Sequence, residues 1–338
     1  MNRLDSVKSP LLSESVLQNL FSKKIFTVQK FLEEKPDRIA SISSLQIKDV
    51  ITLRESLITQ FSAFVKKGVD EFLDLKDNSV ELESGIECLD NLLGEVLRTG
   101  NIIEICGLTG SGKTQLCLTI GVNNSLRRNI IVHFIDTSLG NFTGDRIENI
   151  LENKKLTKET IKDAMNRIKI TKVRTMDELV STLHQLKTSL GNQETCCRLI
   201  IIDSLSGVYL PMLNEADNDG SCFMNHIASL MRFISKQFHL LFLVVNLATK
   251  VFDPEACLEH SDEAPVEPNT PFKDLRPLLG RYWLHVPSTR LLIHRIDDRN
   301  LHDTTRTISV LKSSSIPIFS SCSVTIAKEG IVQSETND

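Results

Sequence analysis

One run of eight residues has the types and spacing needed to hold a phosphate group. Two glycines five residues apart, followed by lysine and threonine, form the pattern G-x-x-x-x-G-K-[ST]. The glycines allow a tight turn that aims backbone N–H groups at an anion, and the lysine reaches the outer phosphates. The threonine hydroxyl can bind Mg²⁺. The pattern predicts an ATP·Mg²⁺-binding P-loop made of Gly107, Leu108, Thr109, Gly110, Ser111, Gly112, Lys113 and Thr114.

A carboxylate for the same metal ion follows about ninety residues later. Asp203 ends the apolar run 199–202, and Asp136 ends another such run. In an open parallel sheet, ligands bind where the strands end, so both carboxylates fall at the edge that carries the P-loop. Asp203 is therefore predicted to support the Mg²⁺ bound by Thr114. The alternative, that a buried strand simply ends in aspartate, remains open.

Alternation of strand and helix patterns predicts the element order around this site. Apolar runs at 101–106, 130–136, 199–204 and 240–245 are separated by helical patterns at about 145–153, 158–166, 176–189 and 221–238. Continuous apolar strands with helices between them indicate a mainly parallel sheet covered on both faces. Later β-like runs at 290–294, 307–311 and 323–326 predict an antiparallel extension of the sheet. The expected fold class is α/β.

The N-terminal part has a different pattern. Residues 1–69 carry apolar residues at helical spacing and predict a small all-helical domain of four or five short helices. Residues 70–83 are acidic and suit a linker, and 84–338 form the α/β core. Residues 251–272 hold six acidic residues, four prolines and no lysine or arginine, which predicts a long mobile loop.

Composition excludes several classes of protein. The chain has 338 residues, 41% hydrophobic and 24% charged, and no apolar run approaches the roughly 20 residues that a membrane span needs. The first residues lack the apolar stretch of a secretion signal, and the eight cysteines are scattered, so we expect reduced thiols and no membrane partner. Net charge is −4, yet residues 1–69 hold 11 Lys and Arg against 7 Asp and Glu. This basic part permits DNA contact or is merely solvated.

Several blocks carry a resemblance to a known family. Residues 84–90 and 100–107 are similar to the entry into the core of RecA-type recombinases, residues 134–137 to the second core strand, and residues 279–290 to the block after the second DNA loop. The chain resembles that family over almost its whole length. The resemblance implies a RecA-like P-loop ATPase core, ATP and Mg²⁺ as cofactors, and nuclear residence. It also implies a role in homologous-recombination DNA repair, in a heteromeric complex with other recombinase paralogues on single-stranded or branched DNA.

The chain departs from an active recombinase of that family. Ser138 stands where the family places the glutamate that activates water, and Leu247 follows Asn246 where the family usually has glutamine. No Phe-x-x-Ala segment, the family's contact for homopolymers, occurs in the sequence. We therefore predict at most a slow, DNA-stimulated ATPase, with no catalytic residue assigned, acting as a mediator. A DNA-dependent ATPase that catalyses strand exchange stays open as the alternative, whereas a P-loop kinase for a small metabolite fits poorly.

The resemblance also indicates contacts beyond the chain's own nucleotide. His285 aligns with a family histidine near the nucleotide of the neighbouring subunit. Basic residues flank the acidic loop or lie in the N-terminal domain, and they are the candidates for DNA contact: Lys23, Lys24, Lys250, Lys273, Arg276 and Arg281.

Overall fold

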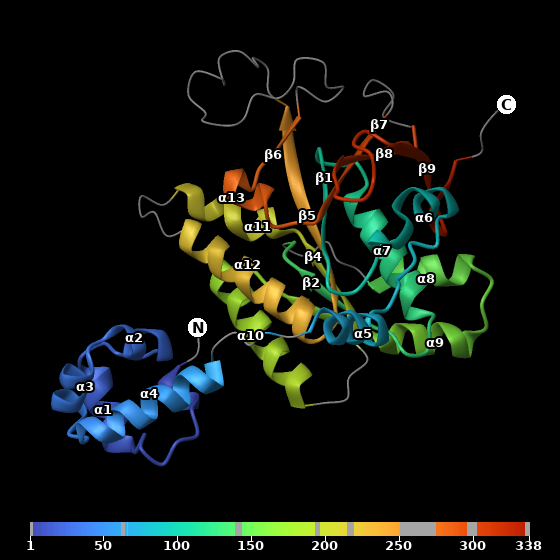
Figure 1. Cartoon of the computed structure of the whole chain (residues 1–338). Helices are drawn as coiled ribbons and strands as arrows, with labels where there is room; N and C mark the ends of the chain where they lie inside the picture. Colours follow the sequence, from blue (N-terminus) through green and yellow to red (C-terminus); the bar gives the residue numbers. More distant parts are fainter. Residues whose placement is uncertain are drawn as a thin grey trace. The chain divides into compact units, whose positions relative to one another are not determined.

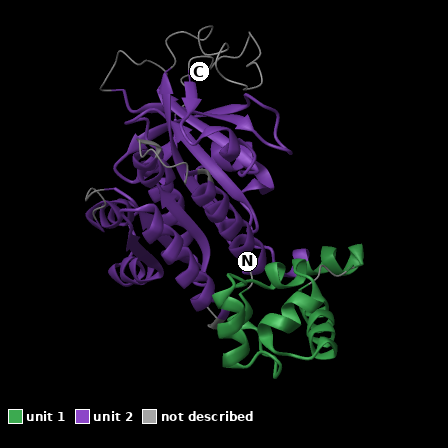
Figure 2. Ribbon diagram, turned by 90° about the vertical axis from the view of Figure 1, so that its left-hand side faces the viewer, with its two compact units in different colours: residues 1–74 green, residues 75–338 purple. Residues whose placement is uncertain are grey.

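Two compact units make up the chain. The computed structural model describes residues 3–61, 65, 67–138, 144–192, 197–214, 220–250, 275–295 and 303–334. The units are Met1–Asp74 and Leu75–Asp338, coloured separately in Figure 2. The division falls inside helix α5 (Gly68–Asn78). The segment predicted as a linker, 70–83, is therefore helical as far as Asn78.

The first unit is helical, as its apolar spacing predicts. Side chains including Leu20, Phe31 and Leu53 are buried in a shared core. Arg54 ties two helices together, because its guanidinium donates to the carbonyl oxygens of Phe31, Leu32 and Glu34, where α2 ends. Besides the start of α5, the elements are η1 (Leu4–Ser6), α1 (Glu14–Ser22), α2 (Val28–Glu33), α3 (Pro36–Ser43) and α4 (Ile47–Phe61).

The second unit is built on one mixed sheet with the order β10-β9-β8-β7-β1-β5-β4-β2-β3, and β6 pairs with β5. Strands β7, β1, β5, β4, β2 and β3 run parallel, and β8, β9 and β10 extend the sheet antiparallel. The predicted α/β fold class is confirmed. The strands are β1 (Ile102–Gly107), β2 (Ile131–Asp136), β3 (Ile168–Lys172), β4 (Cys197–Asp203), β5 (Leu241–Lys250), β6 (Leu275–Pro277), β7 (Thr289–Arg295), β8 (Thr305–Lys312), β9 (Ser321–Ala327) and β10 (Gly330–Gln333).

Helices cover both faces of this sheet (Figure 1). Successive strand residues alternate between two apolar cores: Ile201 and Leu243 join one, and Ile202 and Phe242 join the other. A sheet buried on both faces explains why its strands read as continuous apolar runs. The helices are α6 (Glu87–Leu93), η2 (Gly94–Val96), α7 (Lys113–Ser125), α8 (Gly144–Asn153), α9 (Lys158–Arg167), α10 (Met176–Asn192), α11 (Leu205–Tyr209), η3 (Leu210–Asn214), α12 (Gly220–Gln237) and α13 (Gly280–Leu284).

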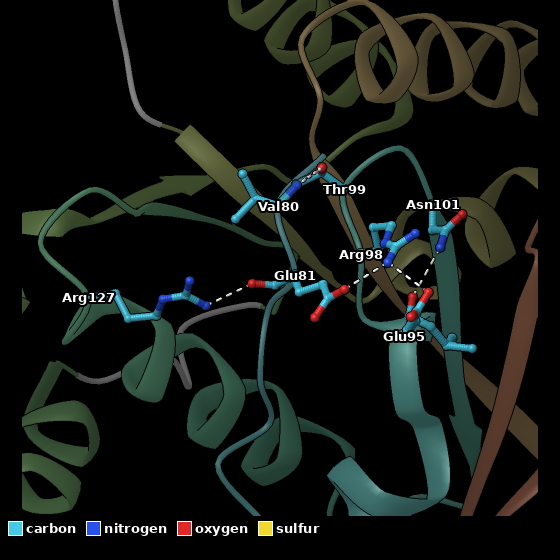
Figure 3. Close-up of polar contacts among 8 residues, drawn as sticks. Val80, Glu81, Glu95, Arg98, Thr99, Asn101 and Arg127 are labelled. Carbon is cyan, nitrogen blue, oxygen red and sulfur yellow. Dashed lines mark hydrogen bonds and ion pairs between the residues drawn. The ribbon is translucent and has the colours of Figure 1, made fainter. Parts of the chain in front are cut away.

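The chain enters β1 through a segment held by polar contacts (Figure 3). The guanidinium of Arg98 lies 2.7 Å from a carboxylate oxygen of both Glu81 and Glu95. Arg127, just after α7, donates to the Glu81 carbonyl oxygen at 2.8 Å. Exposed ion pairs of this kind stabilise a fold only slightly.

The sequence pattern missed strand β3. Its residues alternate Ile-Lys-Ile-Thr-Lys and are largely exposed, because β3 is an edge strand without the continuous apolar run of the central strands. The predicted acidic loop, 251–272, lies outside the described residues. Within the described ranges, no helix combines the length and apolarity that a bilayer crossing requires.

Candidate functional site

The P-loop connects the central strand β1 to helix α7. β1 ends at Gly107 and α7 begins at Lys113, so the intervening residues turn in between. Gly112 has φ +109°, a conformation that residues with a Cβ rarely adopt. A Cβ on Gly107 would overlap the carbonyl oxygen of Ile293 in β7. Both glycines are therefore required by the shape of the loop.

The Lys113 side chain lies inside the loop. Its Nζ donates to the carbonyl oxygens of Gly107 at 2.9 Å and Leu108 at 2.7 Å, and the residue is 7% exposed. Burial lowers the pKa of this ammonium, and the carboxylate of Asp203 opposes that shift. The chain thus places a desolvated positive charge where phosphates would lie, and desolvation strengthens its attraction for an anion.

The predicted metal-binding groups come together at the same edge. Thr114, Asp136 and Asp203 line the same cavity, and β2 and β4 place Asp136 directly opposite Asp203. Burial, with a smaller contribution from Asp136, raises the pKa of Asp203, whereas Thr114 and Lys113 oppose the rise. The buried Oδ2 of Asp136 has no hydrogen-bond partner among the described residues.

These groups fit Mg²⁺. The Thr114 hydroxyl and the two neighbouring carboxylates, one of which has an oxygen without a hydrogen-bond partner among the described residues, offer only hard oxygen ligands, which Mg²⁺ prefers. In the part of the chain that the structure describes, no three His, Cys, Asp or Glu side chains gather into a metal cage. Mg²⁺ typically takes one or two carboxylates and completes its shell with phosphate and water.

A cavity of about 400 Å³ opens beside these residues. Arg146 on α8 forms part of its wall, and its guanidinium donates to the Gln115 side chain and to the carbonyl oxygens of Ala327 and Lys328. Burial lowers the pKa of Arg146. The lining consists of Thr114, Gln115, Leu118, Asp136, Thr137, Ser138, Arg146, Asp203, Ser204 and Gly207.

Ser138 faces this cavity but is bound to its neighbour. Its hydroxyl donates to Asp136 Oδ1 at 2.6 Å, and its backbone N–H donates to the same oxygen at 2.9 Å. The hydroxyl therefore acts as a donor to a carboxylate, which is the reverse of what a general base does. Glu104 offers no substitute, because its buried carboxylate accepts from Asn246 and Arg290.

Sequence reasoning missed one residue that supports the P-loop. Arg306 on β8 is 5% exposed, and its Nε donates to the Ser111 carbonyl oxygen at 2.9 Å. Arg290 on β7 forms a buried ion pair with Glu104 on β1. The available signal for Arg306 was an arginine just before the β-like run 307–311, and this signal does not identify the partner.

His285 lies away from the chain's own P-loop. It follows α13 and lines a cavity of about 580 Å³ at the amino end of β1, whereas the P-loop lies at the carboxyl end. Arg232, Lys236 and Lys312 line the same cavity. The Lys312 ammonium donates to backbone carbonyl oxygens there, and burial lowers its pKa.

The candidate DNA-binding residues fall into two groups. Lys23 and Lys24 are exposed at the end of α1 in the first unit. In the second unit, β5 and β6 pair next to each other and carry Lys250 and Arg276, and Arg281 follows on α13. Lys273 lies outside the described residues.

Comparisons with known proteins agree on one family. The Rad51 family model matches residues 75–334. The mouse protein "DNA repair protein RAD51 homolog 4" is 29% identical over 320 residues, covering 93% of this chain and 91% of that protein. Human "DNA repair protein RAD51 homolog 2" is 24% identical, covering 96% and 88%. The crystal structure of the RadB recombinase shares the fold, with a TM-score of 0.57 and 18% identity over 75% of this chain and 100% of that one. The chain therefore belongs to the Rad51 family.

Proposed function

We propose that this protein is an ATP-binding recombinase paralogue that acts as a subunit of a heteromeric mediator complex in homologous-recombination DNA repair. One observation carries the proposal: Thr114, Asp136 and Asp203 line one cavity beside the P-loop, but the position expected to activate water holds Ser138, whose hydroxyl donates to Asp136. ATP then serves mainly to hold a conformation in which partners assemble. The names of the relatives, which are DNA repair proteins, support the repair role and residence in the nucleus.

The proposed nucleotide site assigns a task to each group. The backbone N–H groups of residues 107–114 bind the phosphates, and Lys113 leaves its two carbonyl partners to reach the outer phosphates. Thr114 binds Mg²⁺ directly, and Asp203 with Asp136 holds the water shell of the ion. Bound Mg²⁺ supplies charge neutralisation at the phosphates.

Hydrolysis at this site is proposed to be slow. Phosphoryl transfer to water requires a group that orients and deprotonates the attacking water. Ser138 lacks the basicity for this task, because a neutral serine hydroxyl is a weak base, and its hydroxyl proton is donated to Asp136. Leu247 cannot form the side-chain hydrogen bond by which a glutamine would sense the outer phosphate.

Partner and DNA contacts complete the proposal. The cavity of His285, Arg232, Lys236 and Lys312 is cationic and lies at the opposite end of β1 from the P-loop, which suits a face that meets the nucleotide of an adjacent paralogue. Lys250, Arg276 and Arg281, or Lys23 and Lys24, would contact the phosphates of single-stranded or branched DNA.

ATP turnover with and without single-stranded DNA tests the proposal. It is measured for the chain alone and together with its sister paralogues. We expect the isolated chain to bind a fluorescent ATP analogue but to turn ATP over slowly in both conditions. Ser138→Glu should raise turnover at least tenfold, because a positioned base contributes about 10²–10⁴ to a rate, whereas Ser138→Ala should change little. Strong DNA stimulation of the wild-type chain alone would instead favour the strand-exchange ATPase.

A further inference from the structure

Two histidines from neighbouring helices of the second unit face each other through their ring nitrogens. His184 is in α10 and His226 is in α12, and the two helices lie side by side on one face of the sheet (Figure 1). The two Nε2 atoms are 3.1 Å apart, whereas the ring centroids are 5.3 Å apart. The rings therefore meet tip to tip and are not stacked face to face.

The packing beneath the pair fixes this approach. Leu183, the neighbour of His184, and Ile227, the neighbour of His226, are buried in the same apolar core. The histidines themselves are exposed, so an ion in solution can reach them. Neither ring receives another hydrogen bond from the described residues, and Nδ1 can carry the proton of each neutral ring. Both Nε2 lone pairs then face the same point.

We propose that His184 and His226 bind a divalent transition-metal ion between α10 and α12, with Zn²⁺ as the probe. Zinc binds imidazole nitrogen at about 2.0–2.1 Å, so two nitrogens on one tetrahedral zinc ion lie about 3.3 Å apart. The 3.1 Å separation of the two Nε2 atoms is close to that value. Binding therefore requires little movement of either helix.

Without an ion, the same two nitrogens form an N–H···N hydrogen bond. One neutral ring then carries its proton on Nε2 and donates it to the Nε2 of the other ring. Metal binding requires the donor ring to carry its proton on Nδ1 instead, and both Nε2 atoms become ligands. Imidazole nitrogen suits Zn²⁺, Cu²⁺ and Ni²⁺, whereas Mg²⁺ and Ca²⁺ prefer oxygen. The pair therefore differs in chemistry from the oxygen ligands beside the P-loop.

One positive charge lies in the same seam between the helices. Lys187 follows His184 by about one turn, and its Nζ lies 4.4 Å from the centroid of the Phe233 ring on α12. An aromatic face attracts an ammonium group, so this contact directs the lysine along the seam toward the ring. The two Nε2 atoms, in contrast, are directed at each other.

Two protein ligands make an open metal site. No group of three His, Cys, Asp or Glu side chains surrounds one point in the described ranges, so water completes the shell of the ion. Binding is then weaker than at a closed four-ligand site, and it is reversible. Because α10 precedes β4 and α12 precedes the neighbouring strand β5, the ion would join two adjacent strand–helix layers and stabilise the folded unit by mass action.

Calorimetric titration of the metal-free full chain with zinc chloride at pH 7.5 tests the site. Excess Mg²⁺ is present to fill the oxygen site at the P-loop. His184→Gln and His226→Gln should each weaken zinc binding at least about tenfold, since even changes outside the ligand shell cost that much at metal sites. Zinc should raise the melting temperature of wild type, EDTA should reverse the rise, and both variants should lack it.

His239→Asn is the matched control. It removes a histidine of the same unit outside the pair, and Asn tolerates the left-handed conformation at this position, where φ is +50°. Zinc affinity and the melting shift should both stay as in wild type. Because His184 and His226 are exposed, Gln at either position should leave the fold intact, which circular dichroism of the zinc-free proteins checks.

The inference is overturned if wild type binds no zinc under these conditions. It is equally overturned if both histidine variants bind zinc as tightly as wild type does, and the pair is then only a hydrogen-bonded contact between helices. Cys222 is an exposed thiol one turn before His226 on α12. Zinc binding that is lost in Cys222→Ser but kept in both histidine variants would place the ion at that thiol and contradict the proposed pair.

Discussion

At the scale of single residues, Lys113 provides the most direct test of the nucleotide site. A hydrogen bond to a charged group contributes about 1.5–3 kcal/mol, so Lys113→Ala should weaken ATP binding roughly 10- to 100-fold. Titration with a fluorescent ATP analogue measures the change. Lys158→Ala, at the exposed start of α9, removes an equal charge away from the site and should leave the affinity unaltered. Equal affinities for Lys113→Ala and wild type would show that Lys113 does not bind the nucleotide.

The sequence could predict the site residues that lie close together along the chain, but not the pairs that lie far apart. Residues 107–114 are contiguous, so their pattern is visible without any knowledge of the fold. Asp203 ends an apolar run, and that position alone placed it at the P-loop edge. Arg306 and Arg290 could not be assigned in the same way, because their partners Ser111 and Glu104 lie nearly two hundred residues earlier in the chain. Only the order of the strands brings such pairs together.

At the scale of elements, the buried Glu104–Arg290 ion pair joins the paired strands β1 and β7. Removing one partner of such a pair leaves an uncompensated charge and costs about 3–5 kcal/mol. Arg290→Met should therefore lower the free energy of unfolding by roughly this amount, as measured by urea denaturation. The double variant with Glu104→Gln should lose markedly less, since the amide can still accept from Asn246. Additive losses in the double variant would contradict a coupled pair.

The edge pairing of β2 with β3 predicts a pH dependence. Burial, together with Lys169 directly opposite on β3, lowers the pKa of His133 to about 4, and the imidazole is hydrogen-bonded to Thr171 at 2.8 Å. Between about pH 6.5 and 4 the unfolded chain binds a proton that the folded chain does not. His133 thus costs no stability above pH 6.5 but lowers it by up to about 3 kcal/mol as the pH falls to 4.

Urea denaturation at several pH values isolates this contribution. His133→Gln keeps a polar partner for Thr171 but cannot titrate, so its stability should fall less than that of wild type below pH 6.5. Because every other group titrates in both proteins, the difference between the two curves reports His133 alone. If the stabilities of wild type and His133→Gln changed in parallel from pH 7 to pH 4, the pKa of His133 would not be lowered in the folded protein.

At the scale of the whole molecule, the chain has the fold of its family but lacks the Phe-x-x-Ala segment through which members of the family form homopolymers. No Phe-x-x-Ala occurs in the full sequence, so a second copy has no such segment to offer. We expect the isolated protein with ATP and Mg²⁺ to sediment as a small species at all concentrations, with or without single-stranded DNA. Addition of a partner paralogue should give a discrete larger complex. Analytical ultracentrifugation measures both, and long concentration-dependent filaments of the chain alone would contradict the mediator role. Because that readout does not depend on hydrolysis, it separates the question of assembly from the question of whether Ser138 limits turnover.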